Sequence, residues 1–150
     1  MTATPSPWAR RLHDLLSGRR PPDVYRLVTT TRADKVANAA RAEGWTTWIL
    51  TGEPTTKAGL LVAAATAMEF PAWFGHNWDA LADCLTEVAT EAPGGLLVWP
   101  DAGALAAAAP DEWAVALDVL RRAVAFHADH DWTFAVVCLG ERAPTELPRL

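Results

Sequence analysis

Three carboxylates recur at helical spacing near the middle of the chain. Asp79, Asp83 and Glu87 are each four residues apart, which places them along one face of an α-helix. Two carboxylates one turn apart can transfer protons, hold a divalent cation, or pair with a basic partner. No Lys or Arg occurs between Lys57 and Arg121, whereas nine acidic residues do. The pattern therefore predicts an acidic surface with no basic residue on the same helix to neutralise it.

The same residues make a poor enzyme site. Glycoside hydrolysis needs two carboxyls across a substrate cleft, and a ridge along one helix does not form one. His76 is a possible base or ligand, but one His beside acidic residues is common by chance. The chain has no glycine-rich phosphate loop, no G-x-S-x-G elbow and no H-E-x-x-H motif. We expect no enzymatic activity, no catalytic residues, no metal and no cofactor.

The other candidates for metal or redox chemistry have structural explanations. His127 and His130 fall at the end of a predicted helix. There we expect them to interact with the negative helix terminus and not with a metal. Cys84 falls on the apolar side of a predicted helix and Cys138 in a predicted core strand. Free buried thiols are ordinary in the reducing cytosol. We therefore expect neither a disulfide nor a metal site.

A loop and a helix must position the carboxylates. Residues 71–75 are rich in aromatic side chains and are broken by Gly75. Asn77 is a good N-cap, and Asp79 in the first turn is favoured by the helix dipole. The helix is predicted to run to about residue 90, with its three carboxylates exposed. Its buried face is predicted to consist of Leu81, Cys84, Leu85 and Val88.

Strand and helix patterns alternate along the rest of the chain. Strands are predicted at residues 23–30, 45–51, 96–99 and 132–139, with a turn at 92–95. Helices are predicted at 8–16, 31–43, 56–69 and 102–109, and a long one begins at 111. This order predicts an α/β fold with about four parallel strands. We expect one domain at residues 22–140, between an N-terminal tail with a short amphipathic helix (1–21) and a C-terminal tail (141–150). The expected core tryptophans are Trp45, Trp48, Trp99, Trp113 and Trp132.

Charge and hydropathy narrow the choice of partner. The 150 residues carry a net charge of −5. Phosphates require a basic surface, so the acidic centre disfavours nucleic acid and favours a basic protein. A solvated acidic face that only keeps the protein soluble has the same appearance. We expect no membrane span, no secretory signal, a cytoplasmic location and a monomer in the free state.

The central segment resembles the barstar family, intracellular inhibitors of the secreted ribonuclease barnase. The resemblance is carried by Pro71, Trp73, Phe74, Gly75, Asn77 and the runs Asp79-Ala80-Leu81 and Asp83-Cys84-Leu85. The order of elements agrees over residues 45–140. The resemblance implies a barstar-like α/β fold, with a small three-stranded parallel sheet packed with helices. The predicted strand at 23–30 would be an added N-terminal edge strand. It also implies a cis peptide at Ala92–Pro93.

The resemblance also implies roles for single residues. Asp83 takes the position of the family's central aspartate, which mimics a phosphate in the active site of the ribonuclease. Asp79 matches a second interface aspartate, and Trp73 matches an interface tyrosine. The family's prototype has tryptophans where this chain has Ala82 and Val88. The predicted partner-binding residues are Trp73, Gly75, Asn77, Trp78, Asp79, Ala82, Asp83, Thr86 and Glu87.

Two functions follow as alternatives. The first is a bacterial, immunity-type inhibitor of a secreted or toxic ribonuclease. The second is a binding module of the same fold that recognises a different basic protein. Replacement of the two tryptophans by Ala82 and Val88 leaves the identity of the partner open.

Overall fold

The structure is a computed structural model that describes residues 6–150. Residues 1–5 of the predicted N-terminal tail lie outside the described residues. The elements are α1 (Pro7–Leu16), β1 (Val24–Leu27), α2 (Ala33–Ala42), β2 (Thr46–Ile49), α3 (Lys57–Ala67), α4 (Trp78–Leu85), β3 (Gly94–Trp99), α5 (Ala102–Ala108), α6 (Pro110–Ala128) and β4 (Thr133–Leu139).

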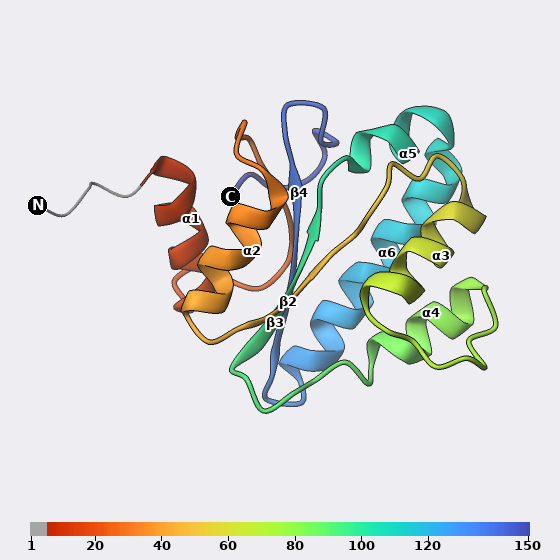
Figure 1. The fold of residues 1–150 in the computed structure, drawn as a ribbon, viewed down its shortest axis with the longest axis horizontal. Coiled ribbons are helices and arrows are strands. Elements are labelled where there is room, and N and C mark those ends of the chain that lie inside the picture. The colour runs from red at the N-terminus through yellow and green to blue at the C-terminus, as the bar shows by residue number, and fades with distance from the viewer. Residues whose placement is uncertain (1–5) are drawn as a thin grey trace, which may run out of the picture.

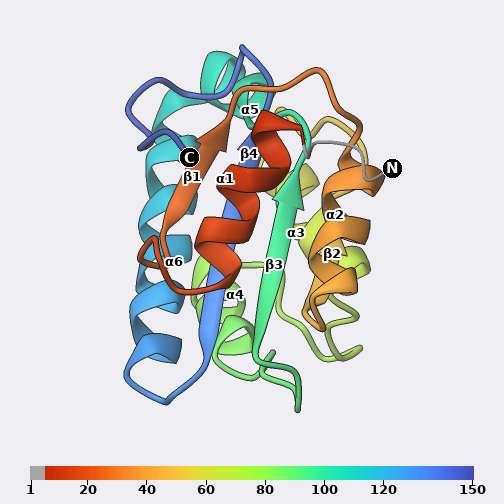
Figure 2. The same cartoon turned by 90° about the vertical axis from the view of Figure 1, so that its left-hand side faces the viewer.

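The four strands form one parallel sheet in the order β1-β4-β3-β2. One row across the sheet shows the register: Val24 pairs with Val136, which pairs with Leu97, which pairs with Trp48. Figure 2 shows β1 at one edge of the sheet and β2 toward the other. The predicted α/β fold with an added N-terminal edge strand is therefore confirmed.

Helices cover both faces of the sheet. Figure 1 shows α1 and α2 on one side, and α3, α4 and α6 on the other, with α5 near one end. Each side has its own apolar core. The central strands β3 and β4 are buried almost throughout, because both of their faces are covered. This explains why their sequences are nearly all apolar.

Two glycines let tryptophan rings pack on the sheet. A Cβ atom on Gly95 would lie 2.6 Å from the rings of Trp48 and Trp132, and one on Gly94 would lie 2.8 Å from the ring of Trp45. Residues 94 and 95 were predicted as part of a turn, and this is wrong because they begin β3. Because these two residues have no side chains, the tryptophan rings can pack directly against the backbone of β3.

The predicted core tryptophans are confirmed with one exception. Trp45, Trp99, Trp113 and Trp132 are buried. Trp48 is only half-buried, because it lies on β2, an edge strand that has a neighbour on one side only.

The segments outside residues 22–140 pack on the sheet. Leu12 and Leu15 of α1 are each 1% exposed and join the core beneath α1 and α2. At the other end, the Arg26 N–H donates to the Pro148 carbonyl, and the Leu150 N–H donates to the Arg26 carbonyl, both at 2.9 Å. The C-terminal residues thus lie along the outer edge of β1. The division into a domain at residues 22–140 with a tail at each end stays a prediction.

Two further expectations concern the backbone and the membrane. No peptide bond among residues 6–150 is cis, so the expected cis bond at Ala92–Pro93 is wrong. Trans is the favoured isomer even before proline, by about 0.5–1 kcal/mol. The indole N–H of Trp132 donates to the Ala92 carbonyl in this arrangement. Among residues 6–150, no helix has both the length and the apolarity to span a bilayer.

Candidate functional site

The loop before α4 is fixed at both of its ends. Phe74 is 5% exposed and packs its ring against Phe70 and His76, with centroids 5.1 and 4.9 Å away. Asn77 caps α4, because its side-chain oxygen accepts the Ala80 N–H at 2.7 Å. Its side-chain nitrogen donates to the Gly75 carbonyl at 3.3 Å. The loop is therefore anchored by the buried ring of Phe74 and by the hydrogen bonds of the Asn77 side chain.

This anchoring leaves one large side chain outside. Trp73, next to the buried Phe74, is 71% exposed. An indole of this size in solvent is unusual in a protein with a well-formed core, and aromatic residues of this kind often mark contact surfaces. Gly75 and Asn77 are exposed beside it.

The helix α4 presents two carboxylates to solvent. Asp79 and Asp83 are exposed, and neither forms an ion pair with any of residues 6–150. Leu81, Cys84 and Leu85 on the opposite side are buried. The prediction of an acidic face and an apolar face is therefore confirmed for the helix itself.

The helix is shorter than predicted. It ends at Leu85 instead of about residue 90, because the backbone bonds change from four-residue to three-residue spacing. The Thr86 hydroxyl donates to the Asp83 carbonyl at 2.6 Å and tightens this end. Glu87 is exposed as predicted, but it lies in the turn after the helix. Val88, predicted as buried, is only half-buried because it is also past the helix end.

A histidine from α6 holds the end of α4. His127 is 1% exposed, and its Nε2–H donates to the Leu85 carbonyl at 2.6 Å. This carbonyl is one of the four that a helix leaves unpaired at its C-terminus. The sequence predicted that His127 serves the end of its own helix, and this is wrong because its ring turns toward α4. No local signal in the sequence reveals a partner 42 positions away.

The remaining predicted site residues flank the acidic face. Trp78, Ala82 and Thr86 are half-buried. The Lys57 ammonium lies 5.6 Å from the centre of the Trp78 ring, within the range of a cation–π contact. Sequence reasoning did not connect Lys57 to this site, although it is the last basic residue before the acidic stretch.

The chemistry available at this surface is charge pairing. Burial, helped by the nearby charges of Glu87 and Asp83, raises the pKa of the Cys84 thiol above its ordinary value. A thiol in this state is a poor nucleophile. Residues 6–150 contain no group of three or more His, Cys, Asp or Glu side chains placed to hold a metal ion. The surface can bind a cationic group, and its side chains offer no acid–base pair across a cleft.

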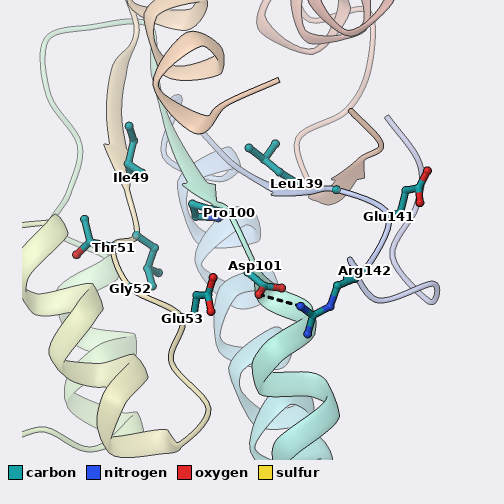
Figure 3. A pocket seen from close by; sticks show the side chains of 11 residues that line it. Ile49, Thr51, Gly52, Glu53, Pro100, Asp101, Leu139, Glu141 and Arg142 are labelled. Atoms are coloured by element: carbon teal, nitrogen blue, oxygen red, sulfur yellow. Dashed lines mark ion pairs between the residues drawn. The ribbon is translucent and has the colours of Figure 1, made fainter. Parts of the chain in front are cut away.

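A second feature lies at the other end of the sheet. A cavity of about 580 Å³ opens at the carboxyl ends of β2, β3 and β4, the usual position of ligands in open α/β sheets. Figure 3 shows Glu53, Asp101, Glu141 and Arg142 around it, with the Arg142 guanidinium 3.6 Å from the Asp101 carboxylate. Among the described residues that line this cavity, Arg142 is the only basic one, and it is already paired with Asp101. The surplus of carboxylates disfavours the binding of phosphate groups.

Comparison with known proteins identifies one family. The model of the family Barstar (barnase inhibitor) matches residues 45–138. No curated protein matches the chain. Among solved structures, the ORC2 protein of Aeropyrum pernix in its ADP form is similar, with a TM-score of 0.57 and 14% sequence identity. The likeness covers 88% of this chain and 39% of that one, so this chain spans well under half of that protein. At this identity the likeness concerns the fold alone.

Proposed function

The chain belongs to the barstar family, a family of inhibitors and not of enzymes, and we propose that it inhibits a ribonuclease. In this proposal the acidic face of α4 enters the basic active site of the enzyme. The observation that carries it is the pair of exposed carboxylates, Asp79 and Asp83, on a helix whose other face is buried. Neither has an ion-pair partner among residues 6–150, so both are available to cations of another protein.

The chemistry of the target supports this role. A ribonuclease holds RNA phosphates with Arg, Lys and His in a concave site. Carboxylates accept the same charge-assisted, often bidentate, bonds from arginine that phosphates accept. Asp83 would take the place of the central phosphate, Asp79 would pair at its side, and Trp73 would pack on the rim of the active site.

The rigidity of the surface supports it as well. Asn77 fixes the start of α4 and His127 fixes its end, and little conformational freedom is left in between. Binding by a rigid element loses less entropy than binding by a loop that must become ordered. The predicted surface of Trp73, Gly75, Asn77, Trp78, Asp79, Ala82, Asp83, Thr86 and Glu87 combines this rigid helix with its anchored loop.

The experiment is an inhibition assay with purified barnase as the first enzyme and a panel of other bacterial secreted ribonucleases after it. RNA hydrolysis is followed with increasing amounts of the chain. The Asp79→Asn/Asp83→Asn double variant serves as the matched control, because it keeps side-chain size and removes both charges. Inhibition by the chain and its loss in the control support the proposal. Equal inhibition by both proteins would contradict it.

A second candidate is a module of this fold that binds another basic protein. The small Ala82 and the half-buried Val88 favour it, because each stands where the family's prototype offers a tryptophan. Affinity capture with the chain and with the double variant separates the two. A basic protein without ribonuclease activity, retained by the chain alone, would favour the second candidate.

A further inference from the structure

A cavity opens at the C-terminal end of α4, next to Glu87. It has a volume of about 390 Å³ and lies between β2, the end of α3 and the residues that follow α4. This is within the range of small-ligand sites, roughly 300–1,000 Å³. We propose that this cavity is a second subsite for the partner protein and that it receives one arginine side chain. The proposal rests on the proposed function, in that the arginine belongs to the same partner.

The charge of the cavity points to a cation. Glu69 lines it from the end of α3 and Glu87 from the turn after α4. Both are exposed, and neither has an ion pair or a side-chain hydrogen bond within the described part of the chain. No Lys, Arg or His is among the residues that line the cavity. Two unpaired carboxylates from two different elements therefore face one space.

The backbone fixes the position of Glu69. It has a φ of +54°, the left-handed region that usually takes glycine after a helix. The next N–H, that of Phe70, donates to the Ala65 carbonyl at 3.0 Å and closes the end of α3. The carboxylate at this position is thus attached to a well-defined turn.

The walls of the cavity suit a flat cation. Trp48 and Phe70 line it, and each ring is held by another ring. Trp48 lies against Phe134 with centroids 6.2 Å apart, and Phe70 lies against Phe74 at 5.1 Å. A guanidinium group stacks on aromatic rings and bonds carboxylates in a planar fork, whereas an ammonium acts as a point charge. Met68 adds an apolar surface for the methylene groups of the side chain.

The first experiment needs no ribonuclease. The chain is labelled with ¹⁵N and titrated with N-acetyl-arginine amide, followed by heteronuclear NMR. N-acetyl-citrulline amide, which has nearly the same shape and no charge, is the control ligand. We expect arginine to shift the indole N–H of Trp48 and the amides of Glu69 and Glu87, and citrulline to leave them in place. Equal shifts with both ligands, or shifts confined to Asp79 and Asp83, would overturn the proposal.

Variants provide the second arm. Glu69→Gln/Glu87→Gln should weaken arginine binding by about fivefold or more, the effect expected for two partly screened charge pairs. Glu91→Gln is the matched control, because Glu91 is exposed in the same region and does not line the cavity. It should change the affinity less than about twofold. Unchanged arginine binding in the double variant would overturn the subsite.

Failure of the subsite and failure of the ribonuclease proposal give different results. If arginine binds as expected and no ribonuclease is inhibited, the subsite stands and the ribonuclease proposal fails. If a ribonuclease is inhibited and arginine does not bind, the subsite is overturned and the proposed function stands.

Discussion

The ring of His127 donates a hydrogen bond from Nε2 to the carbonyl oxygen of Leu85, 2.6 Å away. This bond joins the last turn of α6, a helix that covers the sheet, to the last residue of α4. The ring is 1% exposed and packs against Trp132 and Phe134, with centroids 5.0 and 5.8 Å away. The end of the acidic helix is therefore held by the core of the domain, and the carboxylates keep a fixed position relative to the sheet.

Removing this donor should destabilise the fold. We expect His127→Phe, which keeps an aromatic ring, to lower the free energy of unfolding by about 1–3 kcal/mol, because the Leu85 carbonyl is left without a partner. The measurement is urea unfolding followed by tryptophan fluorescence. His130→Phe is the control. Its ring nitrogen Nδ1 also bonds a carbonyl, that of Phe126, at 2.6 Å, but this ring is exposed and water can replace the lost donor. The loss at His130 should therefore be the smaller one, at most about 1 kcal/mol. Equal losses in the two variants would contradict a special role for the His127–Leu85 bond.

A methyl group at Gly95 should disturb the tryptophan packing. Its Cβ would lie 2.6 Å from the rings of both Trp48 and Trp132, so both rings, or the strand itself, have to move. We expect Gly95→Ala to cost about 1–3 kcal/mol, as overpacking does elsewhere. Gly59→Ala on α3 is the comparison, because its Cβ would meet its nearest neighbour at 3.2 Å and alanine favours helix. A urea midpoint unchanged by Gly95→Ala would show that the rings adapt freely.

The local parts of the site were predictable from the sequence. Asn77 caps the helix with its own side chain, and the spacing of Leu81, Cys84 and Leu85 defines the buried face. These features depend on residues at most a few positions apart. The carboxylates Asp79 and Asp83 followed from the same register, and both are exposed as expected.

Features that depend on distant residues could not be predicted. The end of α4 is set by turn geometry and by His127, and the sequence alone gives no sign of that contact. Gly94 and Gly95 have the local preference of a turn, but they lie in the strand β3. The rings of Trp45, Trp48 and Trp132 occupy the space that side chains at these two positions would need. The cavity of Glu69 and Glu87 also needs three elements to come together. In each case tertiary packing overrides a local preference.

Stability should fall at alkaline pH. Burial raises the pKa of the Cys138 thiol above its ordinary value of 9.0 and that of Tyr25 above 10.0, so the folded state holds these protons more tightly than the unfolded chain. This contribution is complete below the unfolded pKa and is lost as the pH rises toward the folded pKa. We expect the free energy of unfolding to fall above about pH 9, by at most about 1.4 kcal/mol per pH unit for each group.

Urea unfolding between pH 7 and 11 measures this slope. Cys138→Ala removes one of the three groups whose pKa is raised, the others being Tyr25 and Cys84. It should give a shallower slope above pH 9, whatever its effect on stability at pH 7. The same slope in both proteins would show that Cys138 does not contribute to the alkaline loss.

The sharpest prediction for binding concerns the two aspartates of α4. With a ribonuclease that the chain inhibits, Asp83→Ala should weaken inhibition more than Asp79→Ala or Glu87→Ala. A central carboxylate that is removed leaves desolvated arginines of the enzyme unpaired, at a cost of about 2–5 kcal/mol. A carboxylate at the rim mainly steers the encounter, so its loss should slow association and reduce the salt dependence. Trp73→Ala should also weaken inhibition, because exposed aromatic residues that become buried on binding are frequent hot spots.

Stopped-flow association at two salt concentrations, with dissociation rates measured separately, distinguishes these roles. Thermal unfolding is the control. Asp83→Ala should leave folding almost unchanged, because its side chain is exposed and has no ion-pair partner within residues 6–150. Asp79→Ala should cost at most about 1 kcal/mol, because it removes a negative charge from the first turn of α4. Asp83→Ala should act mainly on the dissociation rate, and Asp79→Ala on the association rate. If all three acidic substitutions changed only the association rate, and by equal factors, α4 would steer its partner without filling an active site.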